Sequence, residues 1–236
     1  MPTIMREPMY PPQVSLEVLY EDDVLLAVNK PAGVVVHPTY KNATGTLLDT
    51  LRARNANSPL FLVGRLDRLT SGVVIAAKTR GVYVEIQRAW SDAEKDYLAV
   101  VRGHVDATRG EIDLPLGTDP ADRRRRVVRP DGARSMTRFE RLGYSEAHGV
   151  SLLRCRLVTG RRHQIRVHLA ARGWPIVGDV VYGTPDSFPR HALHAWRAVM
   201  RHPTSGQPLG LEAPLPVDLV AFLAAAGLSL TCRLHL

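Results

Sequence analysis

A short polar loop between two apolar runs holds the residues with the clearest potential for chemistry. The loop contains Asp67 flanked by Arg65 and Arg68, and it ends in the turn-forming sequence Thr70-Ser71-Gly72. Loops at the ends of strands commonly display functional groups. Two neighbouring guanidinium groups favour the ionised carboxylate, and an ionised carboxylate can act as a nucleophile or as a general base. By spacing alone, a surface salt-bridge loop is favoured over a catalytic one.

A second polar segment opens a predicted helix over Arg161–Arg172. Arg161 and Arg162 at a helix start oppose the helix dipole, so local helix stability does not explain them. A polyanion or a buried carboxylate explains them better. The spacing of Arg162, His163 and Arg166 places the three side chains near one face of this helix. The alternative is an ordinary solvated polar face.

A metal site is the weaker alternative for the same segment. His163 and His168 are five residues apart, whereas a zinc pair on one helix face needs a spacing of four. A metal-dependent hydrolase built from these histidines and Asp179 is therefore disfavoured, and we expect no metal ligands.

Tyr97 lies on a strongly β-like run. On a strand it shares a face with Ala99 and Val101. Tyr97 is then either a core aromatic residue or a platform on which a base stacks, and the spacing by itself favours the core.

The charge balance points to a polyanionic partner. The 236 residues are 45% hydrophobic, as in globular proteins, and the formal net charge is +8. Such a charge favours phosphate contacts and counterion release, although a basic protein without such a partner has the same balance. Arg123, Arg124, Arg125 and Arg126 form an unbroken block, which either grips an RNA backbone or is a solvated charge run.

Several classes of protein are disfavoured. No apolar run approaches the roughly 20 residues that a membrane-spanning helix needs. The first twelve residues lack the charged start and apolar centre of a secretory signal. Cys155 and Cys232 lie far apart and outside any C-x-x-C pair, which argues against a disulfide framework or a zinc knuckle. We therefore expect a cytoplasmic protein that does not enter the membrane.

Short strands dominate the expected secondary structure. The pattern predicts extended segments at Val14–Tyr20, Val24–Asn29, Val34–His37, Phe61–Val63, Val73–Ala77 and Tyr97–Val101, then short antiparallel strands from Gly110 to Val158. Besides Arg161–Arg172, it predicts helices at Thr46–Asn55, Gly81–Trp90 and Val217–Ala226. Strands outnumber helices without alternating with them, which favours an α+β fold on a mixed, mainly antiparallel sheet. We expect one domain over residues 14–236 after a short extension at residues 1–13.

Taken together, four segments resemble the RluA-type family of RNA pseudouridine synthases, in the family's order. They are Asn29–Pro38; Arg65–Asp67 with Thr70–Gly72; Lys95 with Tyr97; and Thr159–Leu169 followed by Pro175–Asp179 and Tyr182–Gly183. Any one segment is a weak signal, but four in order form a strong one. The resemblance runs from about Leu16 to Leu215. It implies a pseudouridine-synthase catalytic domain with helices flanking the sheet, which isomerises chosen uridines in folded RNA.

The resemblance also implies a role for each matching residue. Asp67 is similar to the essential nucleophile, and Arg166 to the arginine that pairs with it. Tyr97 matches the aromatic residue that stacks on the flipped base, and Arg65 matches the arginine that enters the RNA where the base leaves. Flipping costs about a few kcal/mol, and stacking returns about 1–3 kcal/mol per base. Arg68 and His163 are expected to contact RNA nearby.

The implied reaction needs no cofactor and no metal, because it exchanges one bond at C1′ for another without redox change. A single carboxylate also fits it better than the two-carboxylate layout of glycoside hydrolysis. Asp67 either attacks C1′ or removes the C2′ proton, and the sequence leaves both routes open.

One position departs from the family pattern. Gly64 stands where the family usually carries a histidine, and glycine loosens the backbone there. This substitution is the only support for the alternative function, an RNA-binding or folding factor with weak or no catalysis. About a dozen residues precede the first predicted strand, too few for an RNA-binding module. We therefore expect the catalytic domain, as a monomer, to recognise its ribosomal or transfer RNA.

Overall fold

Twelve strands and four helices form the part of the chain that the computed structural model describes, which is residues 16–40, 43–55 and 59–229. The strands are β1 (Glu17–Glu21), β2 (Leu25–Lys30), β3 (Phe61–Val63), β4 (Ser71–Ala77), β5 (Glu94–Arg102), β6 (Arg109–Asp113), β7 (Leu116–Thr118), β8 (Arg126–Val128), β9 (Met136–Ser145), β10 (Val150–Leu157), β11 (Leu193–Arg201) and β12 (Pro208–Glu212). The helices are α1 (Leu47–Arg54), α2 (Arg80–Ala89), α3 (Gln164–Ala171) and α4 (Val217–Ala225).

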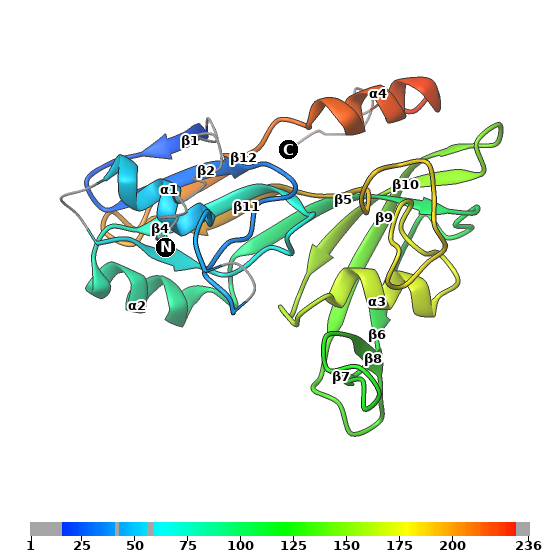
Figure 1. Cartoon of the computed structure of the whole chain (residues 1–236), viewed down its shortest axis with the longest axis horizontal. Helices are drawn as coiled ribbons and strands as arrows, with labels where there is room; N and C mark the ends of the chain where they lie inside the picture. The colour runs from blue at the N-terminus through cyan, green and yellow to red at the C-terminus, as the bar shows by residue number, and fades with distance from the viewer. Residues whose placement is uncertain (1–15, 41–42, 56–58, 230–236) are drawn as a thin grey trace, which may run out of the picture.

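Ten of the strands form one continuous sheet. Its order is β1-β2-β4-β11-β5-β10-β9-β6, with β3 beside β4 and β12 beside β11 (Figure 1). All of its pairings are antiparallel except the parallel contact between β4 and β11. β7 and β8 form a separate antiparallel hairpin. The expected α+β fold on a mixed, mainly antiparallel sheet is confirmed.

In the first half of the sheet, both faces of β2 and β4 are buried. Because side chains alternate across a strand, Leu26 and Val28 pack on one face with α1, while Leu25 and Ala27 pack on the other. The α1 core consists of Leu26, Val28, Val36, Leu47, Leu48, Leu51, Leu60, Leu62, Val74 and Ala76. The opposite core, under Ile86 of α2, includes Val63, Val73, Ile75, Ala77 and Ala198. Helices on both faces explain why these strands are apolar throughout.

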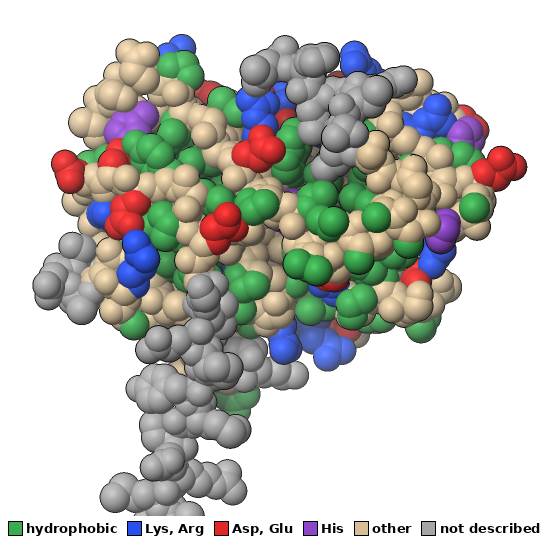
Figure 2. Space-filling model, turned by 90° about the horizontal axis from the view of Figure 1, so that it is seen from above, with side chains coloured by type: hydrophobic (Ala, Val, Ile, Leu, Met, Phe, Trp, Pro, Cys, Tyr) green, Lys and Arg blue, Asp and Glu red, His purple; other side chains and the backbone are tan. Residues whose placement is uncertain are grey.

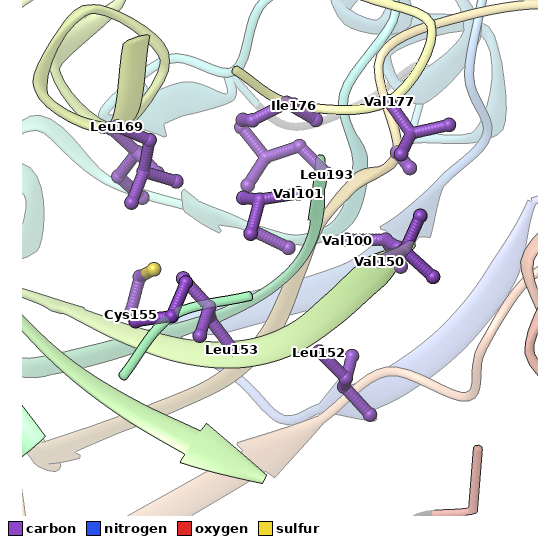
Figure 3. Packing of buried hydrophobic residues seen from close by; sticks show 14 of the residues in the cluster. Val100, Val101, Val150, Leu152, Leu153, Cys155, Leu169, Ile176, Val177 and Leu193 are labelled. Carbon is purple, nitrogen blue, oxygen red and sulfur yellow. The ribbon is translucent and has the colours of Figure 1, made fainter. Parts of the chain in front are cut away.

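The second half of the sheet has its own core. Val100, Val101, Leu152, Leu153 and Cys155 from β5 and β10 are fully buried there (Figure 3). Ile165 and Leu169 of α3 and Leu219 and Leu223 of α4 belong to the same cluster. Figure 1 shows α3 and α4 on opposite sides of these strands, so each helix covers part of one core.

The surface on the α4 side does not carry a concentrated positive charge. Figure 2 shows Lys and Arg side chains there interspersed with Asp, Glu and many apolar side chains. Val217 and Val220 of α4 are among the exposed apolar residues of the molecule. A positively charged surface for RNA is therefore expected on another side of the molecule.

Most predicted elements agree with the structure to within a few residues. Thr46 caps α1 as expected: its hydroxyl accepts from the Asp49 backbone N–H at 3.3 Å, and the Asp49 carboxylate accepts from the Thr46 N–H at 3.0 Å. No helix in the described ranges is long and apolar enough to span a membrane. Part of the first predicted strand, residues 14 and 15, and the extension at residues 1–13 lie outside the described residues.

Two predicted elements are wrong. Val34–His37 is not a strand; instead the carbonyl groups of Val35 and Val36 accept hydrogen bonds from Leu47 and Leu48 at the start of α1. α3 starts at Gln164 and not at Arg161, because His163 is left-handed with φ 58° and cannot continue a helix. Arg162, His163 and Arg166 therefore do not share a helical face.

The two halves of the sheet meet at Gly72. Strands β4 and β11 pair through two residue pairs, Ser71 with His194 and Gly72 with Ala195. Gly72 has φ 118°, and a Cβ atom there would lie 2.1 Å from the carbonyl oxygen of Ala195. Only glycine permits both this backbone conformation and this close approach.

We expect Gly72→Ala to lower the free energy of unfolding by about 3 kcal/mol or more, because it combines backbone strain with a clash against backbone. Gly149→Ala is the matched control, since Gly149 also has a positive φ but nothing lies within 4 Å of its Cβ position. That control should lose only about 1–2 kcal/mol. Urea denaturation measures both, and equal losses would refute the role of the Gly72 contact.

Candidate active site

A cleft of about 1140 Å³ lies where the two halves of the sheet join. It is lined by the loop of residues 64–70 (here the catalytic loop), by the start of α3 and by residues 178–181. Of the predicted site residues, Asp67, Arg166, Tyr97, Arg65, Arg68, His163 and Arg126 all line it. Arg123, Arg124 and Arg125 do not.

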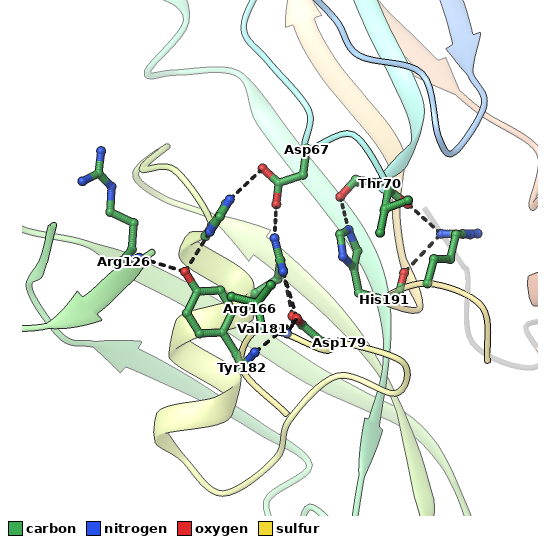
Figure 4. Close-up of polar contacts among 11 residues, drawn as sticks. Asp67, Thr70, Arg126, Arg166, Asp179, Val181, Tyr182 and His191 are labelled. Carbon is green, nitrogen blue, oxygen red and sulfur yellow. Dashed lines mark hydrogen bonds and ion pairs between the residues drawn. The ribbon is translucent and has the colours of Figure 1, made fainter. Parts of the chain in front are cut away.

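Arg166 joins two carboxylates on the floor of the cleft (Figure 4). Its Nη1 donates to Asp67 Oδ2 at 2.8 Å. Its Nε and Nη2 donate to Asp179 Oδ2 and Oδ1 at 2.7 and 2.8 Å. Asp179 Oδ1 also accepts the backbone N–H groups of Val181 and Tyr182. Asp179 therefore fixes the guanidinium plane, and the guanidinium holds one oxygen of Asp67.

The three charges differ in their access to solvent. Arg166 and Asp179 are 5% and 1% exposed, whereas the Asp67 side chain retains 23%. Burial alone raises the pKa of Asp179, but the paired guanidinium of Arg166 outweighs it and holds that pKa below its ordinary value. Burial likewise opposes the charge of Arg166, yet the two carboxylates raise its pKa overall. Asp67 is thus the member of the group that a substrate can reach.

His163 occupies the other side of Asp67. Its Nε2 lies 3.6 Å from Asp67 Oδ1, and its Nδ1 lies 2.7 Å from the Tyr182 hydroxyl. That hydroxyl also accepts the backbone N–H of Arg126 at 2.8 Å, so Tyr182 links His163 to the start of β8. Burial lowers the pKa of His163 to about 4, which keeps the ring neutral at physiological pH.

Buried polar groups anchor the backbone of the catalytic loop. Lys30, fully buried, donates through Nζ to the carbonyl oxygens of Arg68, Val34 and Pro31 at 3.1, 2.9 and 2.8 Å. Arg190 Nη1 donates to the carbonyl oxygen of Leu69 at 3.1 Å. Burial lowers the pKa of Lys30 to about 7, but three acceptors match the three hydrogens of the ammonium form.

Thr70 adds a side-chain anchor at the end of the same loop. Its hydroxyl lies 2.8 Å from His191 Nε2 in a buried contact (Figure 4). Burial lowers the pKa of His191 to about 4, so this ring is neutral too. Two successive carbonyl groups and the following side chain are therefore fixed directly after Asp67.

Tyr97 reaches the cleft from β5. It is partly buried, and it packs against the core of the second half of the sheet. Burial, with the nearby charge of Asp67, raises the pKa of Tyr97 and keeps its phenol neutral. The position of Tyr97 is compatible with both interpretations of the sequence, a core aromatic residue and a platform for a base, since the side chain packs on the core and also lines the cleft.

The arginines that flank Asp67 do not pair with it. Arg65 is exposed at the cleft and has no ion pair with any described residue, while Arg68 Nε donates to the carbonyl oxygen of Gly33 at 3.0 Å. Gly64 has φ 76°, a conformation that glycine adopts without strain. A Cβ atom at position 64 would lie 3.6 Å from the Trp90 ring. Glycine therefore suits the backbone at this position.

The four block arginines are not equivalent. Arg124 pairs with Asp122 at 2.9 Å and Arg125 lies 3.9 Å from Asp119. Arg126 hydrogen-bonds the Thr118 hydroxyl and lines the cleft. Arg123 is exposed. Neighbouring carboxylates thus offset two of the four charges, which leaves Arg123 and Arg126 without an ion pair among the described residues.

The histidines of the metal alternative do not converge. His168 is fully buried on α3, where its ring nitrogens bond the Thr137 hydroxyl and the Leu114 carbonyl oxygen at 2.9 and 3.0 Å. Asp179 is engaged by Arg166. Over the described residues, no three His, Cys, Asp or Glu side chains group as metal ligands.

Comparisons with known proteins agree with this geometry. The family model described as RNA pseudouridylate synthase matches residues 24–171. The chain belongs to this family. "Ribosomal large subunit pseudouridine synthase D" of Xanthomonas campestris pv. campestris is 39% identical, over 91% of this chain and 70% of that protein. The protein of the same name from Nitrosomonas europaea is 40% identical, over 90% of this chain and 65% of that protein.

A solved structure agrees as well. The protein titled "Human RNA Pseudouridylate Synthase Domain Containing 1" has 28% sequence identity and a TM-score of 0.73, covering 89% of this chain and 87% of that one. The chain is thus an isomerase of the RNA pseudouridylate synthase family that acts on RNA.

Sequence reasoning underrated four residues of the site. Asp179 and Tyr182 were noted within a motif, but their contacts to Arg166 and His163 were not predicted. Lys30 and His191 were assigned no role. A lysine at the end of an apolar strand, directly before Pro31, was the available signal for Lys30, because a buried ammonium group must have acceptors.

We expect Asp179→Asn to lower kcat roughly 10- to 100-fold, about 1.4–2.7 kcal/mol, because an amide nitrogen cannot accept from the guanidinium and Arg166 would turn away from Asp67. Tritium release from C5-labelled uridine in RNA measures the rate.

The matched control is Asp96→Asn. Asp96 is 2% exposed and makes the same two-bond contact to Arg156, at 2.7 and 2.7 Å, outside the cleft. This variant should lose stability and keep kcat. Equal loss of kcat in both variants would show that ion-pair loss alone, and not the orientation of Arg166, controls the rate.

Proposed function

We propose that this protein isomerises a uridine of large-subunit ribosomal RNA, with Asp67 as the reactive carboxylate. The observation that carries the proposal is the hydrogen bond from Arg166 to one oxygen of Asp67, in a cleft that belongs to a pseudouridylate synthase. Arg166 engages Oδ2 and leaves Oδ1 for the substrate. A fixed cation beside the carboxylate holds it in one orientation and leaves its other oxygen unbonded by Arg166.

Two routes satisfy the chemistry at Asp67. In one, Oδ1 attacks C1′, the C1′–N1 bond breaks, and its electron pair leaves on the uracil. In the other, Oδ1 takes the C2′ proton and the same bond breaks to give a glycal. The uracil then turns and C5 bonds to C1′. In the first route the Oδ1–C1′ ester bond breaks as this bond forms, and in the second Asp67 returns its proton to C2′. Finally the C5 proton leaves and N1 gains a proton. The atoms balance without any cofactor, so the site has to orient the base and exclude water.

Two other residues suit the flipped base. Tyr97 lines the cleft as a neutral aromatic side chain supported by the core, which suits a stacking platform. Arg65 is exposed beside the reactive loop without an ion partner among the described residues, which suits insertion into the RNA where the base leaves. Both roles follow the family resemblance, and the position of the side chains supports them.

The names of the relatives support the choice of ribosomal over transfer RNA. The continuous ten-stranded sheet supports a single catalytic domain over residues 14–236. The wide separation of the two cysteines supports a reducing, cytoplasmic location. We also infer that the protein works as a monomer, because Asp67, Arg166 and Tyr97 come together without a residue from a second copy.

A strain that lacks the gene should lose pseudouridine at a large-subunit position, and chemical mapping of ribosomal and transfer RNA measures this. The wild-type gene should restore the modification and Asp67→Ala should not, because no other carboxylate of the cleft is free. The purified variant should bind a large-subunit RNA transcript within a few-fold of wild type. Restoration by Asp67→Ala would overturn the role of Asp67, and loss confined to transfer RNA would overturn the target.

The block arginines are expected to contact RNA phosphates. The double variant Arg123→Gln/Arg126→Gln should reduce the slope of log affinity against log salt by about 1.4–1.8, since each phosphate contact contributes roughly 0.7–0.9. Filter binding of the transcript at several salt concentrations measures the slope. Arg109→Gln is the control, because Arg109 pairs with Glu140 on β9 and lies outside the cleft. An unchanged slope in the double variant would refute the phosphate contacts.

A further inference from the structure

The cleft continues past the catalytic loop on the side of Gly64. We call this part of the cleft the Trp90 lobe. It is lined by one residue of the catalytic loop, one of α2, the two residues that follow α2, and one each of β5 and β11: Gly64, Gln87, Trp90, Ser91, Lys95 and Arg197. The proposed roles of Asp67, Arg166 and Tyr97 leave the Trp90 lobe unexplained.

The structure holds Trp90 firmly while leaving part of its ring accessible. Trp90 caps the C-terminal end of α2, and its carbonyl oxygen accepts from Lys95 Nζ at 2.7 Å. The same ammonium group lies 5.2 Å from the ring centroid. The Trp90 side chain is only partly buried, and the missing side chain at Gly64 leaves the adjacent space open.

Two polar groups of the Trp90 lobe, unlike Lys95 and Ser91, have no partner among the described residues. Trp90 Nε1 donates to no residue of the described chain, unlike Trp196, whose Nε1 donates to Glu212 at 3.0 Å. Arg197 is partly exposed and pairs with no carboxylate in the described ranges. Among the described residues, the carboxylates that line the cleft are Asp67 and Asp179, and both are bonded to Arg166. The lobe is therefore aromatic and cationic.

An aromatic ring beside an unpaired cation is the arrangement that binds single-stranded nucleic acid, with a base on the ring and a phosphate on the cation. The Trp90 lobe also lies near the reacting base. Lys95 and Tyr97 project from the same face of β5 two residues apart, roughly 7 Å. A nucleotide in the lobe would therefore be a close neighbour of the flipped uridine along the RNA.

We propose that the Trp90 lobe binds a nucleotide that flanks the target uridine, with its base stacked on Trp90 and its phosphate on Arg197. This inference rests on the proposed function and extends it. The space beside Gly64 thereby becomes part of the RNA-binding surface, and the flanking nucleotide contributes to the choice of uridine.

The test compares Trp90→Leu with Trp90→Phe, using filter binding and tritium release with a large-subunit RNA transcript. Trp90→Leu keeps an apolar side chain but cannot stack, so it should weaken binding roughly 5- to 100-fold. Trp90→Phe should stay within a few-fold of wild type. The rate at saturating RNA should change little in either variant. Arg197→Gln should lower the salt slope by about 1.

Trp174→Leu is the matched control. Trp174 is also partly buried and packs against Phe139 outside the cleft, so its loss should not weaken binding. Wild-type affinity of Trp90→Leu, or equal weakening by Leu and Phe, would overturn the lobe and leave the proposed function intact. Absence of tritium release from the transcript with the wild-type protein would instead overturn the proposed function, whatever the Trp90 variants bind.

Discussion

The arrangement of the cleft depends on one buried guanidinium group between two carboxylates. Arg166 comes from α3 in the second half of the sheet, and Asp67 comes from a loop of the first half. A buried cation with one partner removed would cost about 3–5 kcal/mol, so Asp179 has to be present for Arg166 to fold inward. Once Arg166 is fixed, the position of Asp67 follows, because the catalytic loop must bring a carboxylate to the guanidinium nitrogen that Asp179 leaves unbonded, Nη1. The interaction thus aligns the two halves and holds the Asp67 carboxylate at the cleft in the same step.

The catalytic loop is held through its backbone, which leaves its side chains available. Lys30 and Arg190 bind the carbonyl oxygens of Arg68 and Leu69, and the Thr70 hydroxyl contacts His191. Both cations use neutral acceptors at the loop, so neither neutralises Asp67. Arg190 also pairs with Asp218 at the start of α4, at 2.7 Å. The side chain of Arg190 therefore couples α4 to the catalytic loop. The loop keeps its shape without an ion pair from Arg65 or Arg68.

The sequence predicted the elements whose signals are local and missed those that depend on distant contacts. The α1 cap and the strands β3 and β4 follow from capping chemistry and apolar runs, which a single segment contains. β11 was not predicted, because Leu193–Arg201 alternates poorly and has a bulge between Ala195 and Arg197; its strand form comes from neighbours on both sides. The start of α3 was misplaced because His163 adopts a left-handed conformation beside Tyr182 and Asp67, which lie far from it in sequence. Catalytic identities came from the ordered motifs, since spacing alone favoured a salt-bridge loop for Asp67.

The departure at Gly64 bears on RNA recognition more than on the chemistry. The contacts that place Asp67 come from Arg166, from the backbone anchors at residues 68 and 69, and from Thr70; none of them uses the side chain at position 64. With φ 76°, any other L-residue at this position would carry backbone strain. A histidine would have to accept that strain and would lie against Trp90. Glycine avoids the strain and leaves the Trp90 indole uncovered on that side. The chain therefore lacks the contact of a histidine at position 64, but the indole is available for the base stacking proposed above.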